Sequence, residues 1–264
     1  MRPISTTELQ NIQLDILKEV HNFCVASHLR YSLSSGTLIG AIRHDGFIPW
    51  DDDIDIMMPR PDYEAFIQNF HHDYLEVMDY SKDSNYPFTY GKVYDRRTIL
   101  KEKASKTWEN SVYIDVFVID GLGEDLQKAQ AHYRQIRKIR DILTVKIVQL
   151  SSNRNFIRNL ELMVLKVLIS CLPYHSIQKR IIKMMKKFNF ENSEYAGNLN
   201  FGNENRIFKR SMYESLTTHK FEDASFFILK DYETYLSKVY GDYMQLPPEE
   251  KRVTHHAFEA WWKE

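Results

Sequence analysis

Hydrophobic residues along the 264-residue chain follow two spacings, and each spacing predicts a different kind of element. In residues 9–23 they recur every three or four positions, which is typical of an amphipathic helix with one buried face. In residues 53–56 they alternate with polar residues, and residues 112–120 form a nearly continuous apolar run, as strands do. The pattern therefore predicts strands covered by helices.

The same spacings extend this prediction along the rest of the chain. Further strands are predicted at residues 30–34, 74–80, 90–94 and 98–101, with the last two pairing. Further helices are predicted at residues 37–43, 61–70, 126–150, 156–172, 177–188 and 232–240. Together these elements favour an α+β fold with a mixed β-sheet core and flanking helices.

Four aspartates crowd into residues 51–55, next to a strand pattern. Asp is depleted in strands, and like charges this close repel one another unless a cation compensates for them. The period of two places Asp53 and Asp55 on one face and points Ile54 and Ile56 to the core. Such a pair of carboxylates can bind Mg²⁺ or Mn²⁺. Asp51 has the same parity, so it either joins this site or caps the strand.

A third acid lies in the apolar run of residues 112–120. Burying an isolated carboxylate is costly, so Asp115 is expected to be paired with a cation or protonated. We therefore predict that Asp115 is the third metal ligand, with Asp53 and Asp55. The glycines at 121 and 123 are expected to end this strand.

Charge divides the chain into two unlike parts. The whole sequence has 35 Lys and Arg against 36 Asp and Glu, but residues 128–187 contain 14 basic and only two acidic residues. The helix predicted at 177–188 is basic and amphipathic, so it either lies on an anionic membrane surface or belongs to a solvated helical subdomain. Nucleic acid is not expected as a partner, because the basic stretch carries no recognised binding motif.

Composition excludes several classes of protein. Cys24 and Cys171 form neither a disulfide framework nor a zinc pattern, and both are expected to be buried thiols. The N-terminus lacks the apolar core of a signal peptide, and no apolar run is long enough to span a membrane. A cytoplasmic protein is the expectation. We predict a catalytic core at 1–125, a basic helical insertion or subdomain at 126–195, and a C-terminal part completing the catalytic domain at 196–264.

The order of turn, short helix, Asp-x-Asp strand and later Asp strand is that of a nucleotidyltransferase-like fold. The amino-acid sequence of these stretches also resembles the LicD family of phosphotransferases, whose distant relatives include fukutin and fukutin-related protein. The similarity covers over half of the chain, and its first stretch is highly specific. The matching stretches are GTLIGAIRHDGFIPWDDDIDI, YGKVYD, YIDVFVIDG and FED…YETYLSKVYGDYMQLPPEEKRVTHH.

This resemblance implies transfer of a phospho-alcohol group, phosphocholine in the best-known bacterial members, from a CDP-activated donor to a sugar of a surface glycan or glycolipid. Other relatives use CDP-ribitol as the donor in the same class of reaction. Mg²⁺ or Mn²⁺ on Asp53, Asp55 and Asp115 would neutralise the phosphate oxygens, and Asp115 or Asp51 would accept the hydroxyl proton. The expected donor-binding residues are Ser35, Gly36 and Thr37 at a helix start, with Arg43, Lys92 and His255.

Some alternatives stay open for these residues. Lys92 is either a phosphate ligand or an exposed strand lysine, and His255 either contacts donor or acceptor or lies on the surface. Trp261 and Trp262 are expected in a packed or interfacial tail without chemistry. At the level of function, the alternatives are a nucleotidyltransferase that attaches a nucleotide, and a non-catalytic scaffold with a relict metal site.

Overall fold

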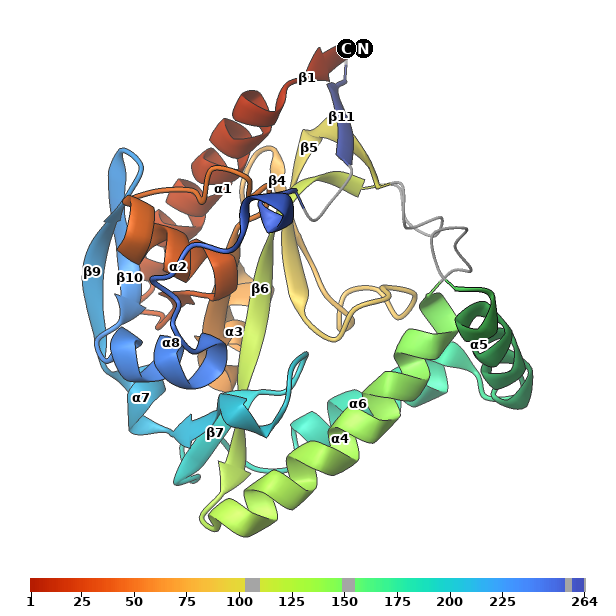
Figure 1. The fold of residues 1–264 in the computed structure, drawn as a ribbon. Helices are drawn as coiled ribbons and strands as arrows, with labels where there is room; N and C mark the ends of the chain where they lie inside the picture. Colours follow the sequence, from red (N-terminus) through yellow and green to blue (C-terminus); the bar gives the residue numbers. More distant parts are fainter. Residues whose placement is uncertain (103–109, 149–154, 255–257, 264) are drawn as a thin grey trace.

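A computed structural model describes residues 1–102, 110–148, 155–254 and 258–263 of the chain. Within these ranges the chain forms a mixed sheet of nine strands, a separate two-stranded hairpin and eight α-helices (Figure 1). The predicted α+β fold class is confirmed. The strands of the large sheet are β1 (Arg2–Ile4), β2 (Ser32–Leu33), β3 (Asp55–Pro59), β4 (Leu75–Met78), β5 (Gly91–Glu102), β6 (Asn110–Gly123), β7 (Tyr195–Asn198), β8 (Ile207–Lys209) and β11 (Phe258–Trp262).

The long strand β6 connects the parts of this sheet. The strand order is β1-β11-β5-β6-β3-β2, with β4 added to β5, β7 added to β6 and β8 added to β7. β3 and β6 run parallel, and their register places Asp55 opposite Asp115. Two acids sixty positions apart in the sequence therefore lie on adjacent strands.

Helices cover the sheet and extend beyond it. They are α1 (Thr6–Ala26), α2 (Ser35–His44), α3 (Arg60–Asn69), α4 (Leu126–Ile147), α5 (Phe156–Leu168), α6 (Tyr174–Met185), α7 (Ser211–Glu214) and α8 (Tyr232–Tyr240). The hairpin of β9 (Leu216–Phe221) and β10 (Ala224–Leu229) packs against β2. Single 3₁₀ turns occur at Glu204–Arg206 and Glu249–Lys251.

The amphipathic pattern of α1 explains how the main core forms. Ser5 caps this helix through a 3.3 Å hydrogen bond from the Glu8 N–H. The predicted apolar face packs on the sheet, with Leu17 and Val20 fully buried. The predicted helices at 61–70 and 232–240 are also confirmed, as α3 and α8.

The helices α4, α5 and α6 form an arm that projects from the body, with α5 at its outer end (Figure 1). α4 and α6 share a second hydrophobic cluster that includes Tyr133, Ile181 and Met185. The Tyr133 hydroxyl donates to the carbonyl oxygens of Asn198 and Phe201, which ties the arm to the sheet. The arm begins at Leu126 and ends before β7, where the chain rejoins the sheet.

Several local predictions were wrong. Residues 90–94 and 98–101 are not a pair of strands but parts of the single strand β5, because β4, β6 and β11 supply its partners. For Trp261 and Trp262 the packed alternative holds, because both lie in β11 between β1 and β5 and Trp262 packs against the main core. Cys24 is buried as predicted, whereas Cys171 is exposed in the turn between α5 and α6. In the described part of the chain, no helix has both the length and the apolar character of a membrane span.

Candidate active site

Four carboxylates meet at one pocket of about 420 Å³. Asp51 and Asp53 come from the loop that precedes β3, Asp55 is the first residue of β3, and Asp115 lies on β6. Strand β3 begins two residues later than predicted. Of the three acids at 51, 53 and 55, only Asp55 therefore lies on the strand. The other residues that line the pocket are Ser35, Gly36, Ile48, Trp50, Phe117, Phe201 and Tyr240.

The start of α2 forms one side of this pocket. α2 begins at Ser35, two residues earlier than predicted, with Ser34 as its N-cap residue. The Thr37 hydroxyl accepts a 2.8 Å hydrogen bond from the Asp55 N–H, so the buried Thr37 positions β3. A Cβ atom at Gly36 would lie 2.5 Å from Oδ2 of Asp51. A side chain at position 36 would therefore displace the Asp51 carboxylate.

Burial and charge repulsion raise the pKa of two of these acids. The pKa of Asp51 rises to about 8, because the carboxyl is desolvated and faces Asp53. The pKa of Asp55 rises well above its usual range, first through burial and then through the charges of Asp53 and Asp115, while the Ser35 hydroxyl opposes this shift. The site therefore disfavours ionised carboxylates unless a cation is present.

Lys92 compensates for one of the four charges. Its ammonium lies 2.5 Å from Oδ1 of Asp115, on the adjacent position of β5, and its side chain is almost completely buried. The ammonium also lies 3.4 Å from the centre of the Tyr113 ring. The alternative of an exposed strand lysine is wrong, and the structure places this cation on Asp115 rather than on the pocket wall.

The donor set fits a divalent metal ion. All the candidate ligands are carboxylate oxygens, which Mg²⁺ and Mn²⁺ prefer. Among the described atoms, Oδ1 of Asp55 is buried without a hydrogen-bond partner, which suits an oxygen that would bind a cation.

Two sets of carboxylates can be compared as ligands. Oxygens of Asp51, Asp52 and Asp53 lie within 4.8 Å of one another. Asp52, however, is buried and absent from the pocket lining, whereas Asp55 and Asp115 face the pocket. We therefore favour Asp53, Asp55 and Asp115 as ligands, with Asp51 beside them.

Aromatic rings form the other side of the pocket. Trp50, Phe117, Phe201 and Tyr240 line it, and the rings of Phe117 and Phe201 meet at 4.6 Å between centroids. Behind this wall, the guanidinium of Arg206 stacks 4.4 Å from the Phe201 ring centre. Among the described atoms, its Nη1 is buried without a hydrogen-bond partner.

The sequence analysis missed this aromatic wall. Phe117 could have been found, because it lies two positions after Asp115 and so shares its face of the strand. Phe201 comes from a segment with no local signal of chemistry, whereas Tyr240 lies in the C-terminal stretch that resembles the family.

Of the other predicted donor residues, Arg43 lies outside the pocket lining. Arg43 donates 2.7 Å to the carbonyl oxygen of Tyr243, and it also contacts His44. This arginine therefore ties α2 to the segment after α8. His255 falls outside the described residues. Arg252, three positions earlier, stacks 5.7 Å from the ring centre of Trp50.

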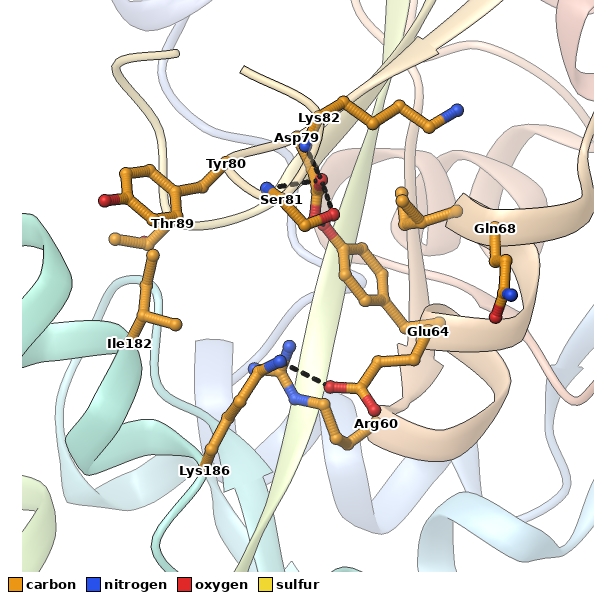
Figure 2. Close-up of a pocket in the computed structure, with 12 residues that line it drawn as sticks. Arg60, Glu64, Gln68, Asp79, Tyr80, Ser81, Lys82, Thr89, Ile182 and Lys186 are labelled. Atoms are coloured by element: carbon orange, nitrogen blue, oxygen red, sulfur yellow. Dashed lines mark hydrogen bonds and ion pairs between the residues drawn. The ribbon is translucent and has the colours of Figure 1, made fainter. Parts of the chain in front are cut away.

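A second pocket, of about 510 Å³, lies between α3, the loop after β4 and α6 (Figure 2). Several of its charged groups are paired: Lys186 contacts Glu64 at 2.6 Å, and Arg60 binds Asp120 of β6 through two bonds. Asp79 accepts a bond from a neighbouring serine hydroxyl. None of the predicted site residues that the structure describes lines this pocket. Although this pocket is the larger of the two, the four clustered carboxylates lie in the first, so we expect the chemistry there.

Comparison with known proteins gives a family match over the region that contains this pocket's carboxylates. The family profile described as LicD/FKTN/FKRP, nucleotidyltransferase domain, matches residues 28–144, which contain all four carboxylates. The lipopolysaccharide cholinephosphotransferase LicD of Haemophilus influenzae is 32% identical over 273 residues, covering 99% of both chains. An uncharacterized protein of Rickettsia typhi is 33% identical over 79 residues, covering 30% of this chain and 23% of its own. One of Rickettsia prowazekii is 31% identical over 80 residues, covering 30% and 27%.

Proposed function

The chain belongs to the LicD family, and we propose that it transfers phosphocholine from a CDP-activated donor to a sugar hydroxyl of a glycan or lipid-linked glycan precursor. Membership makes it a phosphotransferase. The observation that carries the proposal is the meeting of four carboxylates and the α2 helix start in one pocket. The full-length relative named a lipopolysaccharide cholinephosphotransferase supports both the group and the acceptor class.

The reaction proposed is a single displacement at phosphorus. The acceptor hydroxyl oxygen forms a bond to the phosphorus that carries choline, and the bond from that phosphorus to the CMP oxygen breaks. CMP leaves with the bonding electron pair, and the hydroxyl proton passes to a base. Divalent ions on Asp53, Asp55 and Asp115 would supply charge neutralisation at the phosphate oxygens.

The chain's own residues have distinct parts in this scheme. Ser35, Gly36 and the N–H groups at the start of α2 bind the donor phosphates, because helix N-termini attract anions. Lys92 holds Asp115 in place and offsets its charge. Asp51 lines the pocket beside Asp53 and Gly36, and we assign proton acceptance to it.

The aromatic wall supports choline as the transferred alcohol. A quaternary ammonium group carries no hydrogen-bond donor and is recognised through aromatic faces and nearby negative charge. Trp50, Phe201 and Tyr240 provide such surfaces next to the carboxylates. A polyol such as ribitol would instead need hydrogen-bonding partners along its length.

A donor panel tests this proposal. The protein is incubated with Mg²⁺, an oligosaccharide acceptor and labelled CDP-choline, CDP-ribitol, CDP-glycerol or CTP. We expect CMP release and a labelled glycan with CDP-choline, and loss of both in EDTA. Release of pyrophosphate with a nucleotide left on the acceptor would instead establish a nucleotidyltransferase. Turnover that survives EDTA would overturn the metal assignment.

A further inference from the structure

Helix α5 exposes an unusual amount of apolar surface. Ile157, Val167 and Leu168 are 61%, 68% and 69% exposed. Hydrophobic side chains that lie open to water in such a contiguous group mark a surface that binds something. The large hydrophobic residues that are exposed on α5 and the turn that follows it are Ile157, Leu160, Met163, Val164, Leu165, Val167, Leu168 and Leu172.

The helix is attached to the arm by a narrow face. Leu162 is buried against α4, in a shallow groove that it lines with Thr144 and Val148. Lys166 donates a 2.9 Å hydrogen bond to the carbonyl oxygen of Lys146. Arg158, Glu161 and Leu165 line the same groove, and α5 lies at the outer end of the arm (Figure 1).

Basic residues accompany this apolar face. Residues 128–187 contain 14 Lys and Arg and two acids, a net charge of +12. Lys179, Arg180 and Lys183 are exposed on α6, the next helix along the chain after α5, and Lys183 lies in its last turn. The apolar residues of α6 do not join this surface, because Ile177 and Ile181 are buried against α4.

We propose that the apolar face of α5 inserts into the interfacial region of an anionic lipid bilayer, with the exposed basic residues of α6 contacting the lipid headgroups. An interfacial helix needs an apolar face and adjacent cations, and here two consecutive helices provide them. A second copy of the chain is a poorer occupant, since it would bring two strongly basic arms together. This docking surface does not depend on which group the enzyme transfers.

Vesicle flotation tests the proposal with the full chain. Vesicles of phosphatidylglycerol and phosphatidylcholine are compared with vesicles of phosphatidylcholine alone, at low and high salt. We expect binding to the anionic vesicles that weakens at high salt. The triple variant Val164→Ser, Val167→Ser, Leu168→Ser is expected to bind about ten-fold more weakly or worse. Lys179→Gln with Arg180→Gln and Lys183→Gln is expected to lose about ten-fold on anionic vesicles.

The matched control carries Val25→Ser and Val253→Ser, two exposed valines elsewhere on the protein, and should bind like the wild type. Circular dichroism checks that every variant is folded. No binding of the wild type to anionic vesicles at low salt overturns the proposal, as does unchanged binding of the α5 variant. A dimer in light scattering that dissociates in the α5 variant would assign the face to a second copy. Vesicle binding requires neither donor nor turnover. A failure of the membrane proposal can therefore be distinguished from a failure of the proposed reaction.

Discussion

The acidic pocket and the helical arm both keep groups in unfavourable surroundings, but the groups are of opposite kinds. The pocket holds carboxylates close together and partly out of water, which raises the pKa of Asp51 and Asp55. The arm exposes aliphatic side chains of α5 to water. In both regions the protein alone leaves an unfavourable free energy that a partner would relieve: a cation in the pocket and an apolar phase at the arm.

Function in this protein is expected where side chains lie in unfavourable surroundings. Most of the chain is locally consistent, with buried apolar residues and paired charges, as stable folds require. Among the described residues, the acidic pocket and the exposed face of α5 are two local exceptions, and they do not resemble each other. Experiments that add the expected partner, or remove the unfavourable group, therefore test the assignment of each region.

The largest effect on stability is expected from Lys92→Met. This substitution leaves Asp115 buried without its cation, which costs roughly 3–5 kcal/mol of the free energy of unfolding. Urea denaturation in EDTA measures the loss. Lys220→Met, at an exposed position on β9, is the control and should change stability little. A stable Lys92→Met protein would mean that the ion pair is not needed to hold Asp115.

Removal of a carboxylate is expected to abolish most turnover. Asp55→Asn should do so without unfolding the protein, whereas Asp115→Asn also removes the partner of the buried Lys92 and should lose stability as Lys92→Met does. Asp55→Asn and Asp115→Asn should each lower kcat on the order of 10²–10³-fold, the usual loss when one charge-stabilising group is removed. Asp223→Asn, which alters an exposed partner of Lys18, should keep full activity. Full activity in either pocket variant would exclude that residue from the site.

Addition of Mg²⁺ should stabilise the protein by filling the pocket. At about a hundred times the dissociation constant, binding adds roughly 2.7 kcal/mol and raises Tm by about 5–10 °C. Differential scanning fluorimetry measures the shift, and Asp55→Asn should remove it. An equal shift in wild type and variant would show that the ion binds elsewhere.

The raised pKa of Asp51 predicts a stability change that depends on pH. A carboxyl with a raised pKa in the folded state favours folding while protonated, and this contribution is lost as pH rises from about 4 to about 8. Without metal, Asp51→Asn should therefore be more stable than wild type by at least about 1 kcal/mol at pH 8, with a smaller difference at pH 4. A difference independent of pH would point to packing instead of charge.

The smallest effect is expected at the aromatic wall. Trp50→Leu should lower kcat/KM for CDP-choline about two- to five-fold, since a cation–π contact contributes about 0.5–1 kcal/mol at a partly exposed site. Trp50→Phe keeps an aromatic face and should retain most of the activity. Equal losses with CDP-choline and CDP-glycerol would show that Trp50 does not distinguish the alcohol.

The sequence predicted the parts of the fold that depend on local periodicity. The helices α1, α3 and α8 and the strand β6 appear close to their predicted positions, because apolar spacing and cap residues act within a few positions. Crowded aspartates also indicated an acidic site, since no local structure accommodates so many charges without a reason. The assignment of Asp53, Asp55 and Asp115 as ligands stays a prediction.

Only the tertiary structure decided which surfaces meet. The register of β3 against β6 brings Asp55 beside Asp115, and the β5 register puts Lys92 on that same acid rather than in solvent. Spacing identified α6 as amphipathic but could not tell whether its apolar face meets protein or lipid. Packing on α4 buries that face and leaves the face of α5 open, because burial depends on neighbours that no local pattern specifies.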